Sequence, residues 1–120
     1  MQRVLATATG NRSATLAWVL VFAAGLLEVG FALSLKGSHG FTRFWPSVAA
    51  MTFGGSSFLL LTLALRSLPV GTAYAVWTGL GAAGTVLIGI VVLDEPSSAG
   101  RVISVVLVLA GIVGLKLYEG

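Results

Sequence analysis

Four long apolar runs fill most of this chain, at about residues 16–36, 44–65, 69–93 and 98–118. Each is at least as long as the roughly 20 apolar residues that carry a helix across a bilayer. Backbone groups in lipid must find their partners within the protein, and runs this continuous lack the alternation of a membrane β-barrel. The sequence therefore predicts an all-α integral membrane fold of four transmembrane helices, embedded in a lipid bilayer.

Composition narrows the function classes further. Hydrophobic residues make up 57% of the 120 residues and charged residues only 9%, which excludes an ordinary soluble domain. The chain has no cysteine and a single histidine, His39, so we expect no metal site and no bound cofactor. Its net charge of +3 comes from scattered Lys and Arg residues, which favours membrane-interface anchors over a nucleic-acid surface.

The first 15 residues differ in composition from the rest of the chain. They contain Thr, Ala, Gly, Asn and Ser but few apolar side chains, and we expect residues 1–15 to form a disordered tail. A secretory signal peptide is an alternative reading, since Arg3 and Arg12 precede an apolar run. That run continues to Leu35, longer than the apolar core of a typical signal peptide, so we predict a four-helix transmembrane domain over residues 16–120.

Glu28 is the only ionisable residue between Leu16 and Leu35. An acid in mid-membrane costs about 2.5–3.5 kcal/mol, so such residues normally face a bundle interior or a water-filled cavity. The alternative is a glutamate that reaches the headgroups from near a helix end. Lys36 lies eight residues further on, about 12 Å along a helix, which keeps Glu28 well inside the apolar layer. We predict a functional carboxylate.

Small, aromatic and hydroxyl-bearing residues are the candidate lining of a site around this acid: Gly25, Phe31, Ser57, Tyr74 and Trp77. Each has a simpler explanation, because a serine can bond its own helix and an aromatic ring can pack against lipid. Together with one anion, however, they are the components of a cation site. A carboxylate that titrates near ambient pH holds either a proton or a cation, which is the basis of a proton-coupled antiporter. No nucleophile–base pair or phosphate loop indicates an enzyme.

Small residues also mark where helices are expected to touch or bend. The candidate hinge or packing positions are all glycines: Gly79, Gly81, Gly84, Gly111 and Gly114. Clusters of small residues let membrane helices approach closely, although glycine is common in such helices generally.

Positive charge gives no firm orientation. Four residues are expected on one side, Arg3, Arg12, Arg66 and Lys116, and three on the other, Lys36, Arg43 and Arg101. The alternatives are one weakly specified orientation and insertion in both. A single acid in so small a bundle indicates an oligomer, most simply a dimer, and dual insertion would make that dimer antiparallel.

Two strings make the sequence recognisable: GFTRFWPS at residues 40–47 and LPVGTAYAVWTG at residues 68–79. With Gly25-x-x-Glu28 and Lys36, they resemble the small multidrug resistance family over most of the chain. The resemblance implies a four-helix, antiparallel homodimer in the plasma (inner) membrane, which exchanges protons for small organic cations.

The same resemblance implies roles for individual residues. Glu28 of both protomers would bind substrate and protons in turn, Ser57, Tyr74 and Trp77 would line the site, and the fourth helix would pack the dimer. Gly25, the Trp77-Thr78-Gly79 string and Gly114-Leu115-Lys116 are similar to the guanidinium-exporter branch.

Phe31 departs from that branch, which usually has tryptophan at this place; phenylalanine keeps a ring and loses the N–H donor.

From the membrane acid and the resemblance together, the sequence predicts proton-coupled export of small guanidinium-type cations. Two alternatives stay open: a broad exporter of lipophilic quaternary ammonium cations, and a non-transporting membrane subunit or half of a heterodimeric transporter.

Overall fold

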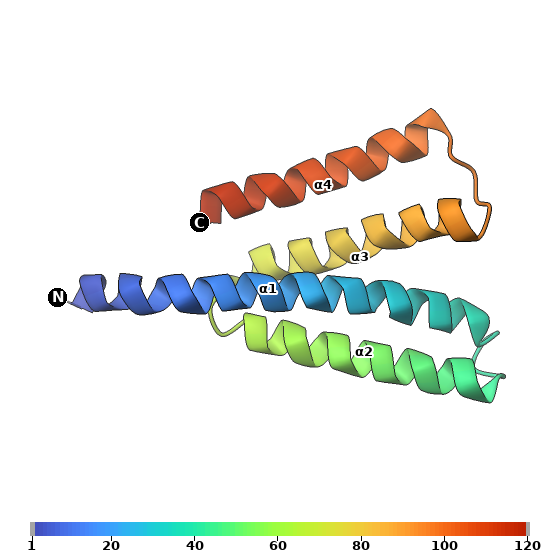
Figure 1. Ribbon diagram of the computed structural model, residues 1–120, viewed down its shortest axis with the longest axis horizontal. Helices are drawn as coiled ribbons and strands as arrows, with labels where there is room; N and C mark the ends of the chain where they lie inside the picture. Colours follow the sequence, from blue (N-terminus) through green and yellow to red (C-terminus); the bar gives the residue numbers. More distant parts are fainter. Residues whose placement is uncertain (1, 120) are drawn as a thin grey trace.

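The computed structural model describes the backbone of residues 2–119 and the side chains of residues 14–118. Over these residues it forms four helices: α1 (Gln2–Gly37), α2 (Phe44–Ala64), α3 (Val70–Val92) and α4 (Ala99–Glu119) (Figure 1). Each contains a stretch that is long and apolar enough to cross a membrane. The prediction of an all-α chain with four helices able to span a bilayer is confirmed.

The start of α1 differs from the prediction. The backbone is helical from Gln2, whereas the sequence predicts a disordered tail over residues 1–15 and a first helix from about residue 16. No proline interrupts this stretch, and its Ala, Leu, Gln and Arg residues favour helix, so the helix continues toward the N-terminus. The membrane-spanning part begins at Ala14. Every other helix end lies within one residue of its predicted position.

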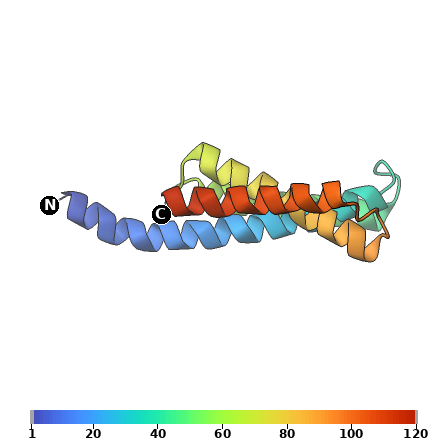
Figure 2. The same cartoon turned by 90° about the horizontal axis from the view of Figure 1, so that it is seen from above.

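The helices lie side by side in the order α2, α1, α3, α4 (Figure 1). α1 and α3 run in the same direction, and α2 and α4 run opposite to them. Figure 2 shows that the four form a slab rather than a closed bundle, with a shortest extent of 17 Å. α1 therefore lies between α2 and α3, and each of its two neighbours covers a different face of it.

Glycines set the spacing between α1 and its neighbours. A Cβ atom added at Gly84 of α3 would lie only 2.6 Å from Cγ2 of Val29, and one added at Gly54 of α2 would lie 2.9 Å from Cδ1 of Phe31. Cβ atoms do not approach carbon this closely without a shift of the neighbour, so these close approaches require glycine. Glu28 lies in the α1–α3 contact that Gly84 permits.

The buried core runs along these contacts and contains Ala17, Trp18, Val21, Ala24, Leu61, Ala64, Leu68, Ala73, Val76, Trp77 and Ile112. Only Ile112 of this cluster belongs to α4. The core is therefore built mainly by the first three helices.

The backbone of α4 approaches only that of α3 among the described helices, and most of the apolar side chains of α4 are exposed. Its contact with α3 uses Gly79, where an added Cβ would lie 3.2 Å from Val108 and 3.3 Å from Ile112. Among the residues with described side chains, none from another helix would lie within 4 Å of a Cβ added at Gly111 or Gly114. A wide apolar face of α4 is therefore left uncovered by residues 14–118.

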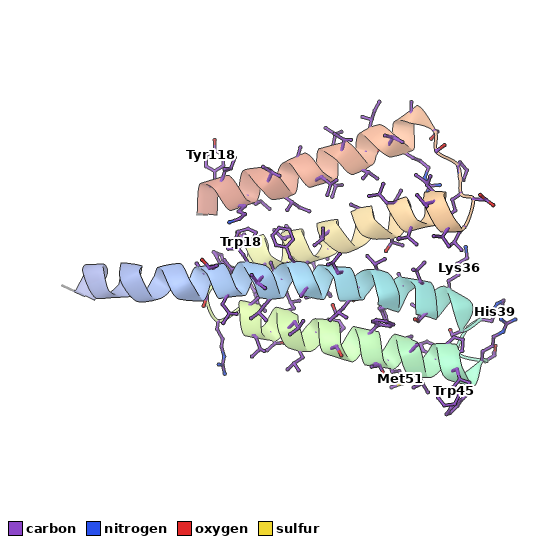
Figure 3. All side chains as sticks on the ribbon, in the orientation of Figure 1. Trp18, Lys36, His39, Trp45, Met51 and Tyr118 are labelled. Atoms are coloured by element: carbon purple, nitrogen blue, oxygen red, sulfur yellow. The ribbon has the colours of Figure 1, made fainter. Side chains whose placement is uncertain are left out.

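Charged side chains gather at the two ends of the slab. At one end the Glu95 carboxylate lies 3.7 Å from Nζ of Lys36 and 3.2 Å from the guanidinium of Arg101, which joins α1 to the start of α4. At the other end Nζ of Lys116 lies 4.9 Å from the centre of the Trp18 ring, a cation–π contact between α4 and α1. Figure 3 shows Lys36 and His39 at the first end and Tyr118 at the second.

Candidate functional site

Glu28 lies half-buried on the face of α1 that meets α3. A Cβ atom added at Gly81 would lie 3.0 Å from Cβ of Glu28 and 3.5 Å from the Gly25 carbonyl oxygen. The absence of a side chain at Gly81 therefore lets the stem of the acid lie against the α3 backbone. Glu28 is also the one acidic residue within the four membrane-spanning stretches.

A cavity of about 440 Å³, widely open on one side, adjoins the Glu28 side chain. Its walls come from α1 and α3 only: Glu28, Ala32, Thr78, Gly81, Ala82, Thr85 and Val86. This volume lies within the range of small-ligand sites. One carboxylate among methyl groups and two hydroxyls suits a small cation rather than an anion or a neutral apolar molecule.

A buried hydrogen-bond chain joins α3, α2 and α1 close to this acid. The indole Nε1 of Trp77 donates to Oγ of Ser57 over 2.8 Å, and Oγ of Ser57 donates to the Ala24 carbonyl oxygen over 2.7 Å. Ser57 is fully buried, and its acceptor Ala24 lies one helical turn before Glu28 on α1. Ser57 therefore connects the three helices instead of bonding its own, which was the simpler explanation for a serine in this run.

Two further aromatic rings, those of Tyr74 and Phe58, pack against Trp77. The ring centres of Tyr74 and Phe58 lie 5.4 Å and 5.3 Å from that of Trp77, both in inclined arrangements. Trp77 is buried and Tyr74 is mostly exposed. The rings thus hold Trp77 in place beside Ser57.

The other two predicted site residues face different neighbours. Gly25 is buried against the Leu80 side chain, from which an added Cβ would be 2.8 Å distant. Phe31 points at Gly54 of α2. Of the predicted lining residues only Glu28 borders the cavity, together with Gly81, which was predicted as a hinge or packing glycine. Ser57 and Trp77 lie in the neighbouring hydrogen-bond chain. Direct contact of the others with a substrate stays a prediction.

The sequence did not single out Thr85, although it lines the cavity. Helical spacing could have identified Thr85. Thr78, Gly81 and Thr85 follow each other at spacings of three and four, so they share one face of α3.

Ser57→Ala should lower the free energy of unfolding by about 1–3 kcal/mol, because it leaves the buried Trp77 N–H without an acceptor. Thermal unfolding in detergent measures this. The matched control is Ser104→Ala, which removes only an exposed bond from Ser104 to Gly100 within α4. Equal effects of the two variants would show that the chain through Ser57 does not stabilise the fold.

Within residues 14–118, no three His, Asp or Glu side chains lie close enough together to hold a metal ion. The structural features define a multi-pass α-helical membrane protein with one acidic cavity between its first and third helices.

Comparison with known proteins places this architecture in a family. The model of the family described as Small Multidrug Resistance protein matches residues 16–108. The guanidinium exporter of Yersinia pestis is 54% identical over 102 residues, which cover 85% of this chain and 98% of that protein. Those of Citrobacter freundii and Salmonella typhimurium are 50% identical over 102 residues, covering 85% of this chain and 97% of each. The chain belongs to the small multidrug resistance family, and the predicted resemblance is confirmed.

Proposed function

We propose that this protein exports small guanidinium-type cations across the plasma (inner) membrane in exchange for protons. The observation that carries the proposal is the position of Glu28 on a cavity that holds no other ionisable side chain. The similarity to proteins named guanidinium exporters, over nearly their whole length, supports guanidinium as the substrate class.

The chemistry of the carboxylate gives the exchange. Ionised Glu28 attracts a planar guanidinium and offers two oxygens to a pair of its N–H groups. Protonated Glu28 has no charge and one of its oxygens carries a hydrogen, so the cation loses its partner. A proton and the cation therefore compete for one group, and each can drive the other across the membrane when the cavity opens alternately to the two sides.

We further propose an antiparallel homodimer. The exposed apolar side chains of α4, with Gly111 and Gly114 open to a neighbour, supply a face for a second copy. The near balance of positive charge between the two ends supports insertion in both orientations. The test introduces single cysteines into loops at either end of the helices and labels them with a reagent that reaches one side of the membrane. We expect cysteines at both ends to be labelled. Labelling of cysteines at one end only would contradict insertion in both orientations.

Export of bulkier quaternary ammonium cations is the competing function. The cavity volume of about 440 Å³ and its methyl groups favour it, as does a phenylalanine rather than a tryptophan at residue 31. A quaternary ammonium makes no N–H hydrogen bond, so apolar contact and the Glu28 charge would have to hold it.

Uptake by proteoliposomes separates these functions. With an outward proton gradient imposed by internal acid, we expect guanidinium to enter and protons to leave in a fixed ratio. Tetraphenylphosphonium and tetrapropylammonium serve as bulky cations, and protein-free liposomes as the control. Proton movement driven by the bulky cations but not by guanidinium would replace the proposed function with the competing one, and movement with neither would favour a non-transporting subunit.

A further inference from the structure

Thr85 lies one helical turn after Gly81, the residue against which the Glu28 side chain packs. It lines the same cavity as Glu28, and Gly81 lies between them: Glu28 packs against Gly81, and Oγ1 of Thr85 donates to the Gly81 carbonyl oxygen over 2.7 Å. Thr85 is partly buried and comes from α3, whereas Glu28 comes from α1. A ligand held by Glu28 in this cavity therefore has Thr85 as a neighbour on the opposite wall.

The hydroxyl of Thr85 is an acceptor toward the cavity. A hydroxyl has one hydrogen and two lone pairs, and the hydrogen of Thr85 is used in its bond to the Gly81 carbonyl. The remaining lone pairs of Oγ1 have no other hydrogen-bond partner among the bonds that the described residues form. Thr85 thus offers an oxygen but no proton to a ligand.

Guanidinium needs such an acceptor. Its three NH₂ groups all donate, and the Glu28 carboxylate satisfies two N–H groups on one edge. The other N–H groups face an otherwise mostly apolar wall, where an unpaired donor on a charged group is costly. A cation without further N–H groups gains nothing from an oxygen there.

We propose that Thr85 is a specificity-determining residue, whose hydroxyl oxygen accepts an N–H bond from a guanidinium held by Glu28 and so favours cations that keep N–H groups away from the carboxylate. This inference rests on the proposed function, because it takes guanidinium as the ligand. It adds the means by which the cavity distinguishes guanidinium from alkylated cations of the same charge.

The test is a comparison of Thr85→Val with wild type against three probes: guanidinium, the bicyclic guanidinium formed by protonating 1,5,7-triazabicyclo[4.4.0]dec-5-ene, and tetramethylammonium. The bicyclic guanidinium keeps one N–H on each of two nitrogens, the edge that a carboxylate binds, and has no other N–H, while tetramethylammonium has none at all. Valine keeps the shape of threonine and removes the oxygen. We expect the dissociation constant of guanidinium to rise about tenfold, as for a hydrogen bond to a charged group, and those of the other two to change less than about twofold.

Two further variants control for structural effects. Thr85→Ser keeps the oxygen and should bind guanidinium as wild type does. Thr62→Val on α2 removes an exposed threonine with the same kind of local bond, from Thr62 to Phe58 over 2.8 Å, and should leave all three affinities unchanged. Thr85→Ala replaces the valine variant if the latter does not fold.

The outcomes distinguish this inference from the proposed function. Unchanged guanidinium binding in Thr85→Val, beside normal binding in wild type, overturns the role of Thr85 alone. An equal loss for all three probes also overturns it, since that is the mark of a packing role. No guanidinium binding by wild type overturns the proposed function together with the inference.

Discussion

Glu28→Gln should abolish guanidinium-driven proton movement in proteoliposomes while the protein still folds. The amide keeps the size of the side chain and its place against Gly81, but it neither holds a charge nor exchanges a proton. Proton flux measured with an internal pH-sensitive dye should fall to the level of protein-free liposomes. Circular dichroism and gel filtration in detergent should match wild type.

Two further variants serve as controls for Glu28→Gln. Glu28→Asp keeps a carboxylate at a different depth and should retain exchange with a shifted pH optimum. Glu95→Gln removes an acid that lies at the membrane end in ion pairs with Lys36 and Arg101, and exchange should continue. Coupled exchange at the wild-type rate in Glu28→Gln would contradict the carboxylate mechanism.

Gly84→Ala should lower the free energy of unfolding by about 1–3 kcal/mol, the usual cost of overpacking, despite the better helix propensity of alanine. The new Cβ would lie 2.6 Å from Cγ2 of Val29. Valine has one strongly preferred rotamer in a helix, so it cannot turn away cheaply and α1 must move from α3. Glu28 is adjacent to Val29 on α1, and guanidinium affinity should fall as well. Unfolding in detergent and binding measure the two effects.

The same substitution elsewhere on α3 tests this reason. A Cβ added at Gly71 would meet no side chain of residues 14–118 within 4 Å, so Gly71→Ala should be neutral or slightly stabilising. Val29→Ala in the Gly84→Ala background should restore much of the lost stability by removing the methyl group that clashes. If both single glycine variants behave alike, the α1–α3 spacing is not set by Gly84.

The helices could be predicted from the sequence almost to the residue, because lipid leaves little freedom. Runs of about 20 apolar residues admit few structures other than membrane-spanning helices. Lys36 is the last residue of the first run, Arg66 follows the second, and Pro69 comes immediately before α3, so these residues mark the helix ends. The start of α1 could not be predicted in this way, since no proline precedes Ala14 and Gly10 does not end the helix.

The neighbours of each side chain were harder to predict, because these helices are apolar on all sides and the sequence gives no buried face. Glu28 and Phe31 are three residues apart and so about 60° apart around α1, yet one faces α3 and the other α2. Only the order of the helices in the slab separates them. For the same reason the sequence indicated Glu28 but not Thr85. A single threonine in an apolar run is common, and only the structure shows that Thr85 faces the cavity.

The confinement of the site to the first three helices bears on how the chain is synthesised. Glu28, Ser57, Trp77 and Thr85 all precede Val92, the last residue of α3, and α4 contributes no wall to the Glu28 cavity. A growing chain folds from its N-terminus as it leaves the ribosome. Every side chain of the cavity has therefore been translated before α4 begins, and the α1–α3 pairing that forms the cavity needs no residue of the last helix.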